Sequence, residues 1–150
     1  MANTFTCLHY HLIFSTKNRE PWITTDVEQR IWEYLGGIAR TNNMKALQIG
    51  GIEDHVHVVT GIPPSLAVSK ALQLLKGASS KWIHETFSNM AGFEWQDGYG
   101  AFTVSKSNLP DVIDYAAHQR EHHKVRTFQD EYRAFLAKHG IEYDEKYVWG

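Results

Sequence analysis

Residues 53–59, with the sequence Glu-Asp-His-Val-His-Val-Val, constrain the fold more than any other segment of the chain. The valines are β-branched and favour a strand, and side chains two apart in a strand project to the same face. His55 and His57 are therefore expected side by side on one face of a sheet. Imidazoles in this arrangement suit two ligands of one metal ion. The pair alone is a weak signal, because strand histidines are more often structural or at the surface.

The remaining segments predict the order of the other elements. Segments rich in β-branched and aromatic residues predict strands at 5–16, 44–52, 55–61 and 101–105. Apolar residues at helical spacing predict helices at about 27–42, 66–87, 109–124 and 127–140. The order β-α-β-β-α-β, followed by two helices, is the split βαβ arrangement. We therefore expect an α+β, ferredoxin-like (RRM-like) antiparallel sheet with helices on one face and additional C-terminal helices.

Composition narrows the class of protein. With 150 residues, 43% hydrophobic and 21% charged, the chain is expected to form a single globular domain over residues 1–150. A single cysteine, Cys7, excludes an internal disulfide and fits a reducing cytosol. We find no signal-peptide pattern and no apolar stretch near the roughly 18 residues of a membrane span, so we expect a cytoplasmic protein without a membrane partner. The net charge of −2 argues against a strongly basic nucleic-acid coat, but not against a local basic groove.

A polar stripe marks the helix predicted at 109–124. Tyr115 and Gln119 are four residues apart and share a helix face, and His118 and His122 lie on or near the same stripe. Tyrosine, glutamine and histidine together are unusual on a core-facing helix surface. The alternative explanation is a solvated face with the tyrosine packed at its edge.

Several spaced motifs occur in the same order as in a known family. They are His55-Val56-His57, the segment Leu-Lys-Gly-Ala-Ser-Ser at 75–80, the glycine- and aromatic-rich segment 95–105, and the Tyr, Gln and His-His pattern of 115–123. Together they resemble the single-tyrosine HUH transposases, which move insertion sequences as single-stranded DNA and include the REP-associated tyrosine transposases. The resemblance spans nearly the whole chain, with His118 where the family more commonly has asparagine.

The resemblance implies an activity and a site. Tyr115 would be the nucleophile, carried by a C-terminal helix, and would form a 5′-phosphotyrosine link and a free 3′-hydroxyl. His55, His57 and Gln119 would hold Mg²⁺ or Mn²⁺. A different helix register would make His118 or His122 a ligand in place of Gln119. From ligand type alone, Zn²⁺ remains open.

The resemblance also implies single-stranded DNA as the partner, with hairpins at element ends, and a homodimer whose sheets join edge to edge. A long apolar strand at 5–16 would be an aggregation hazard as a bare edge, which is compatible with dimerisation. Trp95, Tyr99 and Phe102 are candidates for stacking on bases, or for a small core. The expected phosphate contacts are Lys17, Arg19, Lys76, Lys81, Lys106 and Arg120.

Four functions compete at this point. The first is a metal-dependent single-stranded DNA endonuclease and strand transferase, a transposase. The second is an HUH nickase or relaxase, which the short chain disfavours. The third is a non-catalytic single-stranded nucleic-acid-binding module. The fourth, a zinc hydrolase, requires a carboxylate base near the metal. Asp54 or Glu53 could serve by sequence proximity, but neighbours in a strand point to opposite faces.

Overall fold

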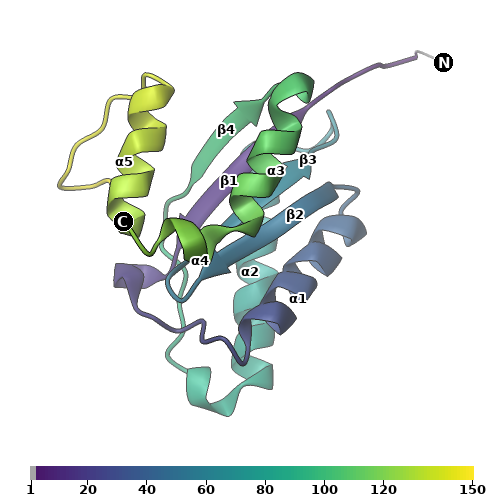
Figure 1. The fold of residues 1–150 in the computed structure, drawn as a ribbon. Helices are drawn as coiled ribbons and strands as arrows, with labels where there is room; N and C mark the ends of the chain where they lie inside the picture. The colour runs from purple at the N-terminus through teal and green to yellow at the C-terminus, as the bar shows by residue number, and fades with distance from the viewer. Residues whose placement is uncertain (1–2) are drawn as a thin grey trace.

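A four-stranded antiparallel sheet forms the centre of the computed structural model, which describes residues 3–150 (Figure 1). The spatial order is β2-β3-β1-β4. This sheet and its flanking helices confirm the α+β, ferredoxin-like prediction. The strands are β1 (His9–Ser15), β2 (Lys45–Ile52), β3 (His55–Gly61) and β4 (Gly100–Val104).

Helices cover both faces of the sheet (Figure 1). On one face α1 (Glu28–Thr41) and α2 (Val68–Thr86) pack against each other and enclose the larger core, which includes Leu12 and Val58. On the other face α3 (Leu109–Ala117) lies across β2 and β3. The chain continues through α4 (Gln119–His122) to α5 (Phe128–Lys138), which packs on Ile13 and Phe102. Short 3-10 segments occupy Lys17–Arg19, Ser88–Met90 and Lys106–Asn108.

Strand β3 is buried along nearly its whole length, and its side chains divide between the two faces. Val56 and Val58 enter the core formed with α1 and α2, so His55 and His57 point to the face covered by α3, α4 and α5. On this face, helix α3 lies unusually close to the sheet. A Cβ at Gly50 on β2 would be 2.1 Å from the carbonyl oxygen of Ala116, so only glycine permits this approach.

The predicted helix 109–124 is wrong as one continuous element. His118 has φ −113° and ψ 39°, outside the helical region, and separates α3 from α4. The change of direction is visible in Figure 1. By contrast, the cap at Thr127 is confirmed, because its side chain accepts a hydrogen bond from the backbone N–H of Asp130 at the start of α5.

The position of β1 overturns one argument for dimerisation. Residues 5–16 were expected to be a long strand that would be hazardous as a bare edge, but β1 begins at His9 and pairs with both β3 and β4. The edge strands are β2 and β4.

Two of the three aromatic residues proposed for base stacking belong to cores. Trp95 is 6% exposed and packs edge-on against Phe14, and Phe102 is 4% exposed in the core beneath α5. Tyr99 is 39% exposed. Among the described residues, no helix combines the length and apolar character needed to cross a membrane.

Candidate functional site

His55 and His57 converge beneath α3 and α5, with ring centroids 5.1 Å apart and no exposed surface. The Nδ1 atom of His55 lies 2.8 Å from Asp54 Oδ1, to which it donates a hydrogen bond. This contact leaves Nε2 facing the interior, 3.1 Å from Oε1 of Gln119. Asp54 therefore orients the imidazole for binding through Nε2.

His57 is held by a second buried histidine. Its Nδ1 atom lies 2.7 Å from Nε2 of His11 on the neighbouring strand β1. Burial lowers the pKa of His57 to about 4, and burial together with His57 lowers the pKa of His11 well below its ordinary value. Both rings are therefore neutral at neutral pH, which is the form that binds metal ions.

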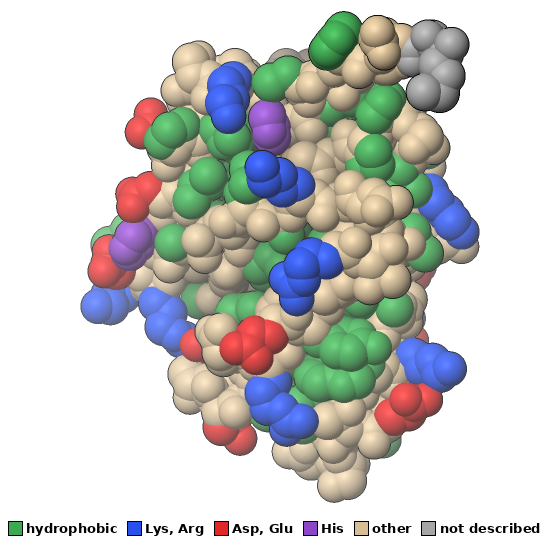
Figure 2. Space-filling view, turned by 90° about the vertical axis from the view of Figure 1, so that its right-hand side faces the viewer, with side chains coloured by type: hydrophobic (Ala, Val, Ile, Leu, Met, Phe, Trp, Pro, Cys, Tyr) green, Lys and Arg blue, Asp and Glu red, His purple; other side chains and the backbone are tan. Residues whose placement is uncertain are grey.

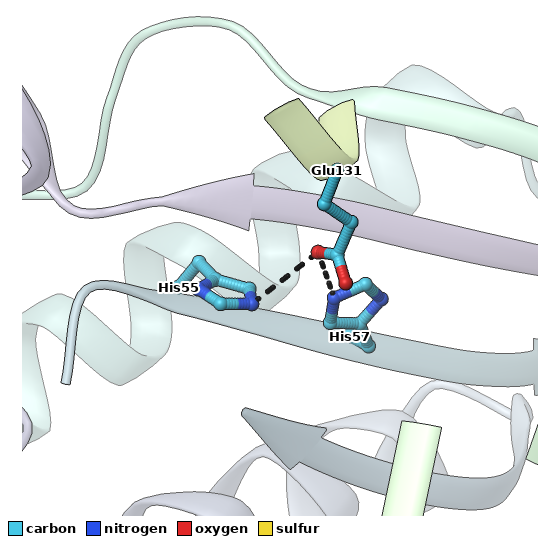
Figure 3. Close-up of side chains that lie close together, drawn as sticks. All are labelled: His55, His57 and Glu131. Atoms are coloured by element: carbon cyan, nitrogen blue, oxygen red, sulfur yellow. Dashed lines mark hydrogen bonds and ion pairs between the residues drawn. The ribbon is translucent and has the colours of Figure 1, made fainter. Parts of the chain in front are cut away.

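Glu131 reaches from α5 to the histidine pair (Figure 3). Its Oε1 lies 2.9 Å from His57 Nε2 and 3.5 Å from His55 Nε2, and its Oε2 lies 3.3 Å from His123 Nε2. Burial alone would raise the pKa of Glu131, but its contacts with His57 and His123 outweigh burial and hold that pKa well below its usual range. The result is an ionised carboxylate with no exposed surface.

These side chains fit a divalent cation. Donor atoms of His55, His57 and Glu131 all lie within 4.8 Å of one another. One ion with bonds of about 2.0–2.2 Å requires donors roughly 3 Å apart. The contacts of 2.9 and 3.5 Å match that spacing. The buried negative charge of Glu131 offsets the charge of a cation, which two neutral imidazoles cannot do. The amide oxygen of Gln119, which faces His55 Nε2, adds a fourth donor.

Tyr115 on α3 stands beside this cluster. Its hydroxyl donates a hydrogen bond to Oε2 of Glu131 and accepts one from Nη2 of Arg126 at 3.3 Å. Its ring stacks on His122, with centroids 4.3 Å apart. Burial and the adjacent Glu131 raise the pKa of Tyr115 above its ordinary value. The hydroxyl is therefore protonated next to an ionised carboxylate.

The structure thus brings Tyr115, His55, His57 and Gln119 into one cluster, as the sequence-based interpretation expected. His118, one alternative ligand, is exposed and its Nδ1 donates to the carbonyl of Asp114. His122, the other alternative, is engaged with the tyrosine ring. Its Nε2 is a buried side-chain atom without a hydrogen-bond partner among the described residues.

Several of the proposed phosphate contacts are occupied within the protein. Arg120 pairs with Glu28 at 2.8 Å and with Glu53 at 2.9 Å. Lys17 lies 3.7 Å from Glu94. Arg19 donates to the carbonyl of Trp149, and its guanidinium lies 5.7 Å from the centre of a Trp149 ring.

The three remaining lysines differ in their surroundings. Lys76 donates to the carbonyl oxygens of Asp97 and Gly98, and burial lowers its pKa to about 8. Lys81 and Lys106 are exposed. On the face of the described chain shown in Figure 2, Lys and Arg side chains are spread singly between acidic and apolar ones. No continuous basic patch is visible on that face.

Sequence reasoning missed Glu131, His11, His123 and Arg126. Glu131 carried a readable signal, because it lies on the buried side of α5 between Phe128 and Phe135 at helical spacing. A charged residue on an apolar stripe is rarely buried without a partner. His11 carried a weaker signal, since its neighbour across the sheet depends on the register of β1 against β3.

Comparisons with known proteins agree with this fold and show the family of the chain. The family model described as IS200-like transposase matches residues 4–119. The chain therefore belongs to the IS200-like transposase family, and its general function is that of a transposase, an enzyme that cleaves DNA. Glu131 and all of α5 lie beyond the matched residues.

Individual relatives support the assignment. The transposase for insertion sequence element IS200 from Salmonella typhimurium is 30% identical over 131 residues, which cover 83% of this chain and 85% of that protein. A crystal structure from Deinococcus radiodurans is 25% identical, with a TM-score of 0.65, over 77% of this chain and 93% of the other. The fold is also similar to that of a REP-associated tyrosine transposase bound to a REP hairpin, with 12% identity and a TM-score of 0.55 over 77% and 70% of the two chains.

Proposed function

We propose that this transposase cleaves and rejoins single-stranded DNA at insertion-sequence ends through a covalent bond to Tyr115. The observation that carries the proposal is the position of the Tyr115 hydroxyl, which shares the Glu131 carboxylate with the His55 and His57 cluster. A nucleophile and a candidate cation site so close together suit attack on a phosphodiester.

In the proposed reaction the oxygen of Tyr115 attacks the phosphorus of a DNA phosphodiester. The bond between phosphorus and the 3′ oxygen breaks, which leaves a 5′-phosphotyrosine link and a 3′-hydroxyl. The net transfer moves the phenolic proton to the leaving 3′ oxygen. Because a phosphodiester is exchanged for another phosphodiester, a 3′-hydroxyl from a second DNA end can reverse the step without ATP.

His55, His57 and Gln119 are the proposed ligands of Mg²⁺ or Mn²⁺, and Glu131 joins them in this chain. A bound divalent cation would polarise the scissile phosphate and stabilise charge in the displacement. Glu131 Oε2 accepts the hydrogen bond of the Tyr115 hydroxyl and so fixes the direction of the oxygen. As long as no cation neutralises the charge of the Glu131 carboxylate, that charge also keeps the Tyr115 hydroxyl protonated.

The proposed partner is single-stranded DNA with a hairpin near the element end, supported by family membership and by the fold shared with the hairpin-bound transposase. A homodimer that pairs edge strands is also proposed, with β2 or β4 as the candidate edge. The six basic residues named from the sequence remain proposed phosphate contacts. Lys81 and Lys106 are the two that are exposed without a described ion pair.

The test uses labelled single-stranded oligonucleotides from the DNA that flanks the gene. The purified protein is incubated with them in Mn²⁺, Mg²⁺ or EDTA and separated on a denaturing gel. We expect a metal-dependent, covalent protein–DNA band that is absent with Tyr115→Phe. Binding without a covalent band on any flanking oligonucleotide would favour the non-catalytic module instead.

A further inference from the structure

A cavity of about 400 Å³ opens beside Tyr115, between α3 and α5. It lies on the side of the tyrosine that the metal-binding cluster does not occupy, because none of His55, His57 and Gln119 lines it. Its volume is in the range of pockets that hold small organic groups and is far larger than an ion requires. The cavity is therefore a space next to the nucleophile for something other than the cation.

Two cations stand at this cavity. Arg126 is exposed, and its guanidinium donates to the Tyr115 hydroxyl at 3.3 Å. Lys138, near the end of α5, is exposed and lines the same cavity. Within residues 3–150 neither side chain forms an ion pair, in contrast to Arg120 and Arg133, which are held by carboxylates. Both charges are therefore free to bind an anion.

The walls between the cations are apolar. Val112 on α3 and Phe135 on α5 line the cavity, and both are only partly buried. Phe135 is fixed by edge-on contacts with His11 and Tyr115, whose ring centroids lie 5.1 and 5.7 Å away. A rigid aromatic ring beside unpaired cations is the combination that binds a base and its phosphates in single strands.

One acidic residue that lines the cavity, Asp111, restricts where the phosphates of a bound nucleotide can lie. Asp111 lines the α3 side of the cavity, next to Asn108, whereas Lys138 lies on the α5 side. A phosphate near Asp111 would be repelled, so the sugar–phosphate backbone is expected along α5 and the base edge is expected towards α3.

We propose that this cavity binds the nucleotide adjacent to the scissile phosphate, with its base against Phe135 and its phosphates on Arg126 and Lys138. The inference rests on the proposed function, because it takes single-stranded DNA as the substrate of Tyr115. The inference adds a specific subsite to that function. The cavity residues from Arg126 onward lie beyond the residues that the family model matches.

The experiment blocks the cavity without disturbing the core. Ala134 is exposed and lines the cavity, and Ala137 is exposed on the same helix but does not line it. Ala134→Leu and Ala137→Leu are therefore matched variants. Binding of a fluorescein-labelled thymidine 12-mer is measured by anisotropy in EDTA, so that no cleavage occurs. Lys138→Gln is compared in the same way with Lys70→Gln, which alters an exposed lysine on α2.

A second readout locates the base directly. A thymidine 12-mer that contains 4-thiothymidine is photo-crosslinked to the wild-type protein, and tryptic peptides are mapped by mass spectrometry. We expect crosslinks on peptide 134–138 or 107–120. We also expect affinity to fall about tenfold with Ala134→Leu, as for the loss of one stacked base, and to change less than about twofold with Ala137→Leu.

Equal affinities of the two leucine variants, crosslinks confined to other peptides, or no binding of the 12-mer would each overturn the proposed subsite. Covalent linkage of Tyr115 to flanking DNA is scored separately with the same preparations. If linkage forms while the cavity results are negative, only the subsite is wrong. If the crosslinks fall on the expected peptides but no linkage forms, the nucleotide site stands and the transferase proposal fails.

Discussion

The hydroxyl of Tyr115 on α3 donates a hydrogen bond to the carboxylate of Glu131 on α5, sixteen residues further along the chain. The other carboxylate oxygen contacts both His57 and His55. One side chain thus connects the proposed nucleophile to the proposed cation site. The relationship makes α5, which follows the residues of the family match, part of the site.

Replacement of Tyr115 by phenylalanine tests the nucleophile. We expect Tyr115→Phe to remove the covalent adduct, because no oxygen remains to attack, and to leave DNA affinity within about threefold. The lost hydrogen bond to Glu131 should cost about 1–2 kcal/mol of unfolding free energy. A denaturing gel, anisotropy and urea unfolding measure the three effects. An adduct that persists in Tyr115→Phe contradicts the assignment.

His57→Ala tests the cation site. We expect Mn²⁺ affinity, measured by calorimetry, and DNA cleavage to be lost together, because His57 contributes one of the converging nitrogens. His118→Ala is the matched control, since His118 is exposed and bonded to its own helix. Loss of Mn²⁺ binding in His118→Ala would mean that His118, and not Gln119, is the helix ligand. Retention of Mn²⁺ binding in His57→Ala would contradict our ligand set.

Glu131→Gln tests the carboxylate that the sequence interpretation missed. The substitution keeps the size of the side chain but removes the buried charge, so we expect Mn²⁺ affinity to fall by at least about tenfold. Asp130→Asn is the control, because Asp130 is the preceding acidic residue on α5 and is exposed. Unchanged affinity in Glu131→Gln would show that Glu131 does not bind the ion.

His11→Phe tests the residue that positions His57. A metal on Nε2 of His57 requires the proton on Nδ1, which then donates to Nε2 of His11. We expect His11→Phe to weaken Mn²⁺ binding about 10- to 100-fold, and His11→Gln, which keeps an acceptor, to recover part of the loss. Equal affinities in both variants and the wild type would leave His11 with a packing role only.

The pH dependence of stability should reflect His57. Its folded-state pKa of about 4 lies below the ordinary value of 6.5, so between these pH values the unfolded chain binds more protons than the folded one. We therefore expect the metal-free protein in EDTA to lose stability as the pH falls from about 6.5 to about 4. Urea unfolding at several pH values measures this loss. His57→Gln should reduce it, and the rest comes from His11, whose pKa burial also lowers. A wild-type profile that is flat over that window would contradict the assigned environment.

The sheet and the shared face of His55 and His57 were predictable from local periodicity, which a single sequence displays. The position of Tyr115 and Gln119 beside these histidines was expected only from the resemblance to the transposase family. The break at His118 was not predictable in this way, because residues 109–124 carry neither glycine nor an internal proline that would end the helix.

The role of Glu131 depends on tertiary structure. Helix α5 was predicted from its cap and apolar spacing, but nothing local shows that it folds back over β1 and β4 to reach β3. The same limit applies to the phosphate contacts. A lysine or arginine in the sequence gives no sign of whether a carboxylate such as Glu28 lies opposite it in the fold.

The measurement that tests the central claim most directly is the identification of the amino acid that carries DNA. The Mn²⁺-dependent adduct is digested with trypsin and nuclease, and the modified peptide is sequenced by mass spectrometry. We predict a nucleotide on peptide 107–120, in which Tyr115 is the only tyrosine. A nucleotide on a peptide that contains another tyrosine, such as Tyr99 or Tyr132, would contradict the account.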